Sequence, residues 1–357
     1  MILLTGATGY LGSRIAQELA RREIPFRVLV RDPTRLRLGN ASSKHCAPSP
    51  GLQPPSPLGR GLGVRGESGT SGFETVVGDL LDAEALEKAL RGVERVIHTA
   101  ALVKVWARAR REFARVNVEG LKALLRAAHE AGVKRVVYTS SFIALGPSAD
   151  ANAGEGLRYP GPFSNEYEET KAGALEWLRA EGFGKFPVIA LLPGVIYGPG
   201  PRTEGNLVGG MIDQYLEGNF PGLLGSGEQC WSFAFNADVV AAHLAALEGG
   251  RLGEEYVLGG DNRSLNEFFQ LLGELSGVQR RVRHLPFLAG KMVGALDLAR
   301  AELFGRPPQL TPGVVEIFRH DWVYSSAKAA KELGYRVTPL EEGVRKTLQN
   351  LSVKDEG

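Results

Sequence analysis

The chain has 357 residues, of which 43% are hydrophobic and 23% are charged, and its formal net charge is +2. This length suits one large or two modest domains, and the composition is that of an ordinary soluble protein. So small a net charge gives no strong basic field of the kind that attracts nucleic acid.

Cysteine usage and the longest apolar stretch narrow the class further. Cys46 and Cys230 form neither a disulfide framework nor a metal-binding spacing, so we expect no metal site and a cytoplasmic location. The first predicted strand begins at Met1 and leaves no room for a signal peptide. We expect an amphipathic helix rather than a membrane span at 285–303, because this stretch is interrupted by Lys291, Asp297, Arg300 and Glu302.

The chain opens with a buried strand, a glycine-rich turn and the start of a helix. An apolar run ends at Leu4, and Thr5-Gly6-Ala7-Thr8-Gly9-Tyr10-Leu11-Gly12 follows. The first glycine permits a tight turn, the second lets the backbone approach a pyrophosphate, and the third lets the helix pack against the strand. The helix N-terminus suits an anion. A glycine triplet alone is weak evidence, but this order of elements predicts a dinucleotide site.

A second strand is predicted at Phe26–Val30, and its end bears on the choice of nucleotide. An NAD-type site carries an acid there, which accepts hydrogen bonds from the ribose hydroxyls. This strand ends in Arg31, whose guanidinium suits the 2′-phosphate of NADP. Asp32 follows and would be the ribose acid in the alternative. We therefore favour NADP and keep NAD open.

The segment from Gly39 to Gly72 interrupts the alternating pattern. It is rich in Gly, Pro and Ser, and its centre at 48–57 cannot form a regular element. A compact fold would join the second and third strands with fewer residues. We expect a mobile surface insertion, which the composition favours over a functional lid.

Strands and helices alternate up to about Leu192, which predicts an α/β fold. The expected architecture is a Rossmann-type doubly wound parallel sheet with helices on both faces. The clearest helix runs from Phe113 to Glu130. Further strands are predicted at Glu74–Val77, Arg95–His98, Lys134–Thr139 and Pro187–Leu192.

The remainder predicts a smaller, mostly helical C-terminal lobe. Residues 1–197 would form the dinucleotide-binding domain, with 233–260 returning to it. Residues 198–232 and 261–350 would form a substrate-binding lobe over the sheet's carboxyl edge, and 351–357 a tail. The expected elements are strands at Phe233–Phe235 and Glu255–Leu258, and helices at Asp238–Glu248, Ser264–Leu275, Phe287–Phe304, Ser326–Leu333 and Pro339–Asn350.

Tyr167 and Lys171 are four residues apart, which places a phenol and an ammonium on one helix face. A lysine near a phenol lowers the pKa of the tyrosine, so Tyr167 is a candidate general acid/base. Ser141 follows the strand that ends at Thr139, at the edge where such sheets bind ligands. Alone, this spacing is more often a surface pair, and strand-end serines often satisfy the backbone. After a phosphate turn, the combination favours a catalytic site.

At this point the chain resembles the short-chain dehydrogenase/reductase superfamily in its extended branch. Within the branch, residues 30–34 look like dihydroflavonol reductases, 256–260 like hopanoid-associated sugar epimerase-like proteins and 333–335 like 3β-hydroxysteroid dehydrogenase-like members. The matching segments follow the family order and cover most of the chain outside the insertion: residues 5–12, 78–80, 98–101, 117–120, 139–141, 167–171 and 193–199.

The resemblance implies a role for each matching residue. Tyr167 would transfer a proton, Ser141 would polarise the same oxygen, and Lys171 would hold the nicotinamide ribose and tune Tyr167. Asp79 and Leu80 would flank the adenine, Ala100 and Ala101 would line the dinucleotide path, and Pro193 and Val195 would border the nicotinamide. The expected cofactor contacts are Gly6, Thr8, Gly9, Tyr10, Leu11, Gly12, Arg31, Asp79, Leu80, Thr99, Ala100, Ala101, Lys171, Pro193 and Val195.

The resemblance also bears on the reaction. Dehydratases of this group carry an Asp-Glu pair where this chain has Ser140-Ser141, which disfavours dehydration. Nucleotide-sugar enzymes carry an arginine for the substrate pyrophosphate where this chain has Trp231, and an indole cannot pair with phosphate. With Phe233 and Phe235 nearby, an apolar substrate is favoured, although such aromatics are commonly core residues. In an epimerase, Arg202 or Arg319 would supply the missing charge.

The leading hypothesis is an NADP-dependent oxidoreductase that reduces a carbonyl, or oxidises the alcohol, of a fairly apolar small molecule. One alternative is a nucleotide-sugar epimerase with tightly bound NAD. The other, from a different class, is a non-catalytic NADP-binding sensor. The expected partner is a small-molecule substrate, with no nucleic acid and no membrane span. The resemblance implies a homodimer through the helices near 113–130 and 167–178.

Overall fold

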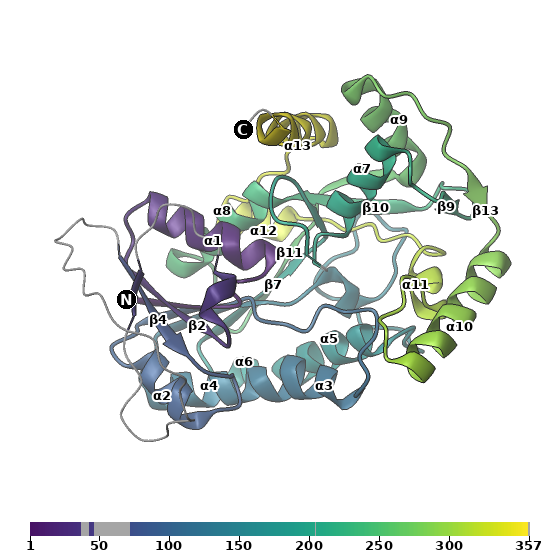
Figure 1. Ribbon diagram of the computed structural model, residues 1–357. Helices are drawn as coiled ribbons and strands as arrows, with labels where there is room; N and C mark the ends of the chain where they lie inside the picture. The colour runs from purple at the N-terminus through teal and green to yellow at the C-terminus, as the bar shows by residue number, and fades with distance from the viewer. Residues whose placement is uncertain (37–42, 46–71, 204, 356–357) are drawn as a thin grey trace, which may run out of the picture.

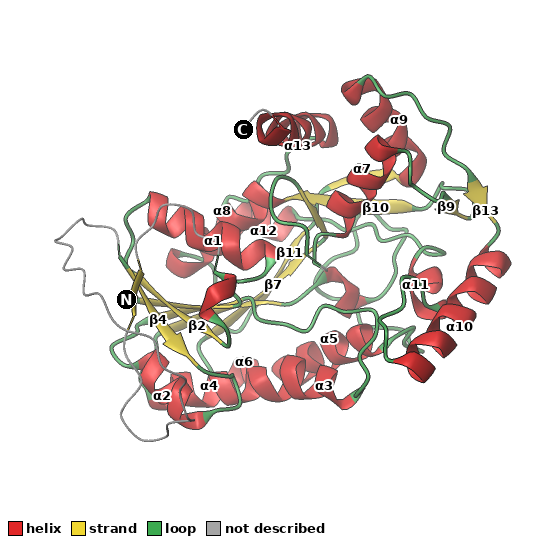
Figure 2. Cartoon of the chain, viewed as in Figure 1, coloured by secondary structure: helices red, strands yellow, loops and turns green. Residues whose placement is uncertain are grey.

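The computed structural model describes residues 1–36, 43–45, 72–203 and 205–355. Their main feature is a parallel eight-stranded sheet in the order β11-β7-β6-β5-β1-β2-β4-β3 (Figures 1 and 2). Its strands are β1 (Ile2–Thr5), β2 (Phe26–Val30), β3 (Ser43–His45), β4 (Phe73–Val77), β5 (Arg95–His98), β6 (Arg135–Thr139), β7 (Val188–Pro193) and β11 (Glu255–Leu258).

Helices cover both faces of this sheet, which confirms the predicted Rossmann-type α/β fold. Side chains alternate along each strand, so Leu4 and Leu3 enter two different cores. One core lies under α1 (Tyr10–Arg21), α8 (Asn236–Glu248) and α12 (Ala327–Leu333). The other lies against α2 (Ala83–Leu90), α4 (Gly120–Glu130), α5 (Glu166–Trp177) and α6 (Phe183–Lys185), and α3 (Arg111–Ala114) lies in the same layer of helices.

The strand order determines where a ligand can enter. From β1 the chain builds β2 and β4 on one side, and it later builds β5, β6 and β7 on the other. A topological switch point therefore lies between β1 and β5, and open α/β sheets bind their ligands beyond the strand ends at such a point. The glycine-rich turn follows β1 and Ser141 follows β6 at this edge of the sheet, and Pro193 is the last residue of β7 there.

The helix predicted from Phe113 to Glu130 begins earlier and contains a wide turn. Between α3 and α4 the chain forms a π-helix, η2 (Arg115–Glu119). A second π-helix, η4 (Leu178–Gly182), joins α5 to α6. Such turns often occur at functional sites, because they redirect side chains within a helix. Here η2 presents the buried Asn117 to the neighbouring loop.

A second sheet links the main sheet to the C-terminal region. In it β10 (Cys230–Phe235) pairs with β8 (Val195–Tyr197) and antiparallel with β12 (Asp261–Ser264). The predicted strand at 233–235 therefore starts three residues earlier and joins this small sheet, whereas α8 and β11 return to the main one. The other C-terminal elements are α7 (Leu207–Glu217), β9 (Leu223–Leu224), α9 (Leu265–Ser276), β13 (His284–Leu285), α10 (Phe287–Phe304), α11 (Pro312–Ile317) and α13 (Leu340–Asp355).

The C-terminal helix is longer than expected, and most of the predicted insertion lies outside the described residues. Helix α13 continues to Asp355, past the expected end at Asn350, because Leu348 and Leu351 still pack against the core. The predicted insertion at 39–72 lies outside the described residues, except for Gly72 and residues 43–45. The latter form β3, which pairs with β4 at the sheet edge.

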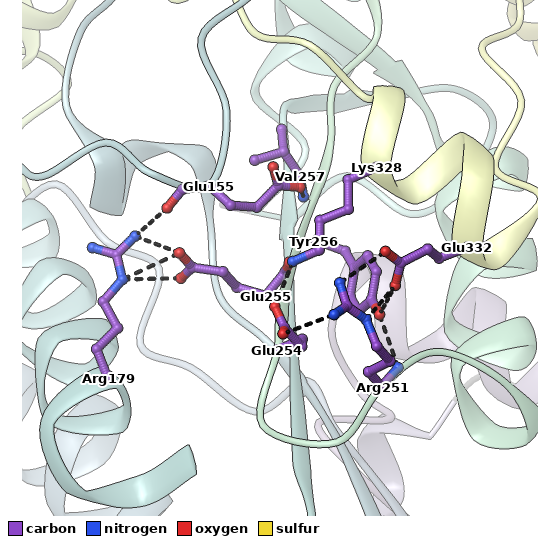
Figure 3. Close-up of polar contacts among 9 residues, drawn as sticks. All are labelled: Glu155, Arg179, Arg251, Glu254, Glu255, Tyr256, Val257, Lys328 and Glu332. Atoms are coloured by element: carbon purple, nitrogen blue, oxygen red, sulfur yellow. Dashed lines mark hydrogen bonds and ion pairs between the residues drawn. The ribbon is translucent and has the colours of Figure 1, made fainter. Parts of the chain in front are cut away.

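A buried polar network secures the edge strand β11 (Figure 3). The guanidinium of Arg179 donates to both oxygens of Glu255, with Nη2–Oε1 at 2.6 Å, and to the main-chain oxygen of Glu155 at 2.7 Å. The Glu155 carboxylate accepts from the backbone N–H of Val257 at 2.8 Å, so it occupies a donor that an edge strand would leave open. A second group of polar contacts lies on the other side of β11 and is formed by Arg251, Glu254, Tyr256, Lys328 and Glu332.

Candidate active site

The glycine-rich turn has the geometry of a phosphate-binding loop. Gly6 has a φ of +80°, and a Cβ there would lie 2.5 Å from the backbone nitrogen of Ala100. A Cβ on Gly12 would lie 2.1 Å from the Gly6 oxygen, whereas one on Gly9 meets only that oxygen, at 3.3 Å. Glycine is therefore required at Gly6 and Gly12 for packing, and at Gly9 its absence of a side chain keeps the approach to the helix open.

The N-terminus of α1 faces this turn without a side-chain cap. Gly9 is the N-cap residue and offers no side chain to accept from the first N–H groups of the helix. The first turn of the helix holds no acidic residue. The first N–H groups of the helix are thus available to an anion such as a pyrophosphate. Tyr10 is buried, and its hydroxyl donates to the Gly198 oxygen at 2.9 Å and accepts from Asn236 at 3.0 Å. These residues fit a bound dinucleotide.

The loops after the neighbouring strands lie around the same turn. The Thr99 hydroxyl donates to the Thr5 oxygen at 2.8 Å, which holds the loop with Ala100 and Ala101 against Gly6. After β4, the Asp79 carboxylate accepts from the Leu81 N–H at 3.0 Å and shapes the turn that carries Leu80. Thr8 belongs to the turn itself and Leu11 to the first turn of α1, while Pro193 ends β7 and Val195 begins β8.

Arg31 and Asp32, which follow β2, differ in the hydrogen bonds of their side chains. The Asp32 carboxylate accepts from the Thr34 N–H at 3.0 Å and from its hydroxyl at 2.6 Å, and these bonds lower the pKa of Asp32. One of its oxygens thereby caps the short helix η1 (Pro33–Arg35). The Arg31 side chain is exposed. Both residues are exposed, and Asp32 differs from Arg31 in that one of its oxygens is occupied as the cap of η1.

Ser141, Tyr167 and Lys171 come together at the carboxyl edge of β6. Ser141 is the N-cap residue of η3 (Phe142–Leu145), and α5 packs against η3. Tyr167 lies in the first turn of α5, and Lys171 follows one turn later. The Lys171 ammonium donates to the main-chain oxygen of Thr139 at 3.1 Å and lies 6.0 Å from the centre of the Tyr167 ring.

The electrostatics of this group differ from the expectation. Burial raises the pKa of Tyr167 to about 12, and the neighbouring Ser141 hydroxyl opposes this rise. Burial lowers the pKa of Lys171 to about 7. The expected lowering of the tyrosine pKa by Lys171 is therefore not found, because removal from water disfavours both charged forms. At neutral pH Tyr167 therefore carries its proton.

A buried histidine packs against Tyr138, the ring over which the Lys171 ammonium lies. His98 Nδ1 lies 2.7 Å from the Thr5 hydroxyl, and its ring stacks on Tyr138 at 5.6 Å. Burial, with a smaller contribution from Lys171, lowers the pKa of His98 to about 3, so it is neutral. The sequence did not predict this buried contact of His98 with Thr5 and Tyr138, because a histidine at a strand end is not a specific signal.

Two further residues position α5, the helix that carries Tyr167 and Lys171. Asn117 accepts from the Leu102 N–H at 2.7 Å and donates to the Thr170 hydroxyl at 3.1 Å, which ties the loop after β5 to α5. The buried Glu168 accepts from the Tyr159 hydroxyl at 2.6 Å and from the Ser164 N–H at 2.8 Å. The segment 117–120 could have identified the first residue, whereas no sequence pattern marks Glu168.

The aromatic residues of β10 are core residues. Trp231 and Phe233 are each 1% exposed, and Trp231 packs on Phe318 at 4.8 Å. Arg202 is paired with Asp213, with Nη2–Oδ1 at 2.5 Å, and Arg319 lies 3.5 Å from Glu316. Both arginines that would have served a sugar pyrophosphate are therefore already paired with acids. Within the described ranges, no group of His, Cys, Asp and Glu side chains is arranged to hold a metal ion.

Comparison with known proteins agrees with this geometry. The chain is 30% identical over 336 residues to sterol demethylase protein B of Methylococcus capsulatus, covering 93% of this chain and 92% of that protein. It is 27% identical to 3beta-hydroxysteroid-dehydrogenase/decarboxylase isoform 1 of Arabidopsis thaliana, covering 98% and 79%. The crystal structure of gox2253 superposes with a TM-score of 0.73 at 30% identity, covering 99% and 98%.

A family model matches most of the chain. It describes the NAD dependent epimerase/dehydratase family and matches residues 2–259, which include the phosphate turn and the Ser141, Tyr167 and Lys171 group. The named dehydrogenases among the relatives agree with the site chemistry, so the protein is an NAD(P)-dependent oxidoreductase. This chain belongs to the NAD dependent epimerase/dehydratase family.

Proposed function

We propose that this oxidoreductase uses NADP(H) to interconvert a carbonyl and an alcohol on a fairly apolar small molecule. The observation that carries the proposal is the meeting of Ser141, Tyr167 and Lys171 beside the phosphate turn. A protonated phenol and a hydroxyl at the cofactor edge are what a carbonyl oxygen needs while its carbon accepts a hydride.

The bound nicotinamide would supply or accept the hydride. In reduction, the Tyr167 phenol gives its proton to the carbonyl oxygen, and the Ser141 hydroxyl donates a hydrogen bond to that same oxygen. In oxidation, the phenolate of Tyr167 removes the proton of the alcohol. Lys171, held against Thr139, stabilises this phenolate whenever its ammonium is charged, and it would bind the nicotinamide ribose.

The cofactor preference rests on the end of β2. Arg31 is exposed there, while one oxygen of Asp32 is occupied as the cap of η1. A guanidinium at this place would bind a 2′-phosphate through charge-assisted hydrogen bonds. The first-turn N–H groups of α1 would hold the pyrophosphate.

The substrate class rests on charge and on the relatives. Arg202 and Arg319 are paired with acids, and Trp231 is buried where a pyrophosphate-binding arginine would be needed. Two relatives carry names that refer to sterols or steroids. We therefore place the substrate among apolar ring alcohols and ketones, bound by the lobe at 198–232 and 261–350 over the domain at 1–197.

A substrate panel tests the proposal. Wild type is expected to oxidise or reduce ring alcohols and ketones with NADP(H), and Tyr167→Phe to lose roughly 100- to 10,000-fold in rate. Tyr256→Phe is the matched control, because it removes a hydroxyl that donates to Glu332 in the β11 network and not to the candidate site. Equal turnover by wild type and Tyr167→Phe would overturn the role of the phenol.

The same panel separates the rival functions. A nucleotide-sugar epimerase would copurify with NAD and convert UDP-sugars without net change in NADPH. A non-catalytic sensor would bind NADPH and leave every substrate untouched.

A homodimer through the helices near 113–130 and 167–178 is a separate proposal, which light scattering of the purified chain would test.

A further inference from the structure

Helix α10 presents its large apolar side chains to solvent. Leu288, Met292, Leu296 and Leu303 follow helical spacing along one stripe, and they are 72%, 61%, 72% and 78% exposed. Figure 1 shows α10 at the outer edge of the molecule, with α11 on its inner side. Isolated exposed leucines are common, but a continuous stripe along one helix marks an interaction surface.

The inner face of the same helix is made of small residues. Gly290, Gly294 and Ala301 are buried, and a Cβ on Gly290 would lie 2.5 Å from a methyl carbon of Leu224. A Cβ on Gly294 would lie 2.9 Å from the backbone of Thr311. The helix is thus packed closely by its smallest side chains while its largest point away from the protein. This is the reverse of an ordinary amphipathic helix.

Basic residues flank the stripe at both ends. Arg281 and Arg283 precede α10 in the chain, Arg306 follows it, and Arg108 lies 3.5 Å from the position of a Cβ on Gly305. Residues 279–320 contain seven Lys and Arg against three Asp and Glu, and residues 100–111 contain four basic residues and no acid. Positive charge is therefore concentrated here in a chain whose net charge is only +2.

The stripe is connected to the catalytic helix. Arg110 reaches Glu166 of α5 at 3.2 Å and Glu302 of α10 at 3.6 Å. Glu166 immediately precedes Tyr167. The C-terminal end of α10 therefore lies one ion-paired side chain away from the helix that carries the candidate acid.

We propose that α10 lies in the headgroup region of an anionic lipid bilayer, with Leu288, Leu296 and Leu303 inserted and the flanking arginines against lipid phosphates. An apolar stripe between basic ends is the pattern of a helix that rests in a membrane surface. None of the described helices has the length and apolarity needed to cross a bilayer. An apolar substrate would then reach the site from the lipid phase, which is the part that rests on the proposed function.

The charges argue against a second copy as the occupant of this surface. Both ends of α10 are basic, so pairing two such helices, in either direction, brings positive ends together. Anionic headgroups complement both ends at once.

Vesicle flotation of the full chain tests the proposal. Wild type is expected to float with vesicles of phosphatidylcholine mixed with phosphatidylglycerol, to bind pure phosphatidylcholine weakly, and to dissociate as salt screens the charges. Leu288→Glu/Leu296→Glu is expected to lose roughly 100-fold in partition, because two inserted leucines become charged. The matched control is Leu252→Glu/Val337→Glu, two exposed apolar residues outside α10.

Three outcomes would overturn the lipid proposal. The first is that wild type does not float with the mixed vesicles. The second is that the α10 variant and wild type partition equally. The third is that wild type forms a dimer, the α10 variant does not, and neither protein binds vesicles. The last would assign the stripe to a second copy. Turnover of a water-soluble ketone by the α10 variant should equal that of wild type, and loss of that turnover in wild type itself would count against the proposed function alone.

Discussion

The ammonium of Lys171 donates a hydrogen bond to the main-chain oxygen of Thr139 over 3.1 Å, which joins α5 to the end of β6. Ser141 lies two residues beyond Thr139, and Tyr167 lies one helical turn before Lys171. One contact between a side chain and a strand end therefore ties together the two segments that carry the three residues. It also holds a lysine in the interior, where its charge is costly.

Replacing Lys171 by methionine is expected to stabilise the fold at neutral and lower pH. Burial lowers the pKa of Lys171 from 10.5 to about 7, so the unfolded chain binds this proton more tightly than the folded one. The wild type is penalised most below about pH 7, and the penalty disappears as the pH rises toward 10.5. Urea unfolding across this range measures the difference. Lys134→Met, at an exposed position, is the control, and a gain that does not change with pH would contradict the assignment.

The two reaction directions are expected to differ in their pH dependence. The pKa of Tyr167 is about 12, so the phenolate needed for oxidation grows with pH up to that value, while the phenol needed for reduction predominates below it. Oxidation should therefore accelerate about tenfold per pH unit, and the contribution of Tyr167 to reduction should stay constant. Ser141→Ala should move the oxidation profile to higher pH, since Ser141 lowers this pKa. Steady-state profiles of kcat/KM test both points, and oxidation independent of pH would refute them.

Arg31→Ala is expected to weaken NADPH binding roughly 10- to 100-fold, because it removes charge-assisted hydrogen bonds to a phosphate, and to leave NADH binding unchanged. Titration calorimetry with each nucleotide gives the two affinities. Arg35→Ala, at an exposed arginine in the neighbouring short helix η1, is the matched control. Equal losses for NADPH and NADH would show that Arg31 does not read the 2′-phosphate.

Arg179→Met is expected to destabilise the protein by about 3–5 kcal/mol, because it leaves the Glu255 carboxylate buried without its cation. The Arg179 and Glu255 side chains are 8% and 11% exposed, and burial already raises the pKa of Glu255. Arg158→Met removes a solvent-exposed partner of Glu176 and should cost at most about 1 kcal/mol. Denaturant unfolding compares the two variants, and equal small losses would show that the β11 network contributes little.

Local patterns in the sequence predicted the main elements well. The bounds of β2, β5, β11 and α10 match the predicted ones, because each is a continuous apolar or periodic segment whose signal lies in its own residues. The strands β8 and β12 were not predicted, since three or four residues carry too little periodicity and form only against β10. The pairing of Arg202 with Asp213 and the burial of Trp231 likewise depend on distant partners.

By itself, the sequence determined the α/β sheet and the phosphate turn, and it identified Ser141, Tyr167 and Lys171 as a trio at one strand edge. Glycine spacing, strand ends and a four-residue helical step are local features with direct geometric consequences. Only the tertiary structure decided the protonation of that trio and the direction in which α10 points. Burial of Tyr167 and Lys171 comes from side chains distant in sequence, and the close packing of Gly290 and Gly294 turns the leucines of α10 outward. Both outcomes depend on which surfaces meet, and that is a property of the folded chain as a whole.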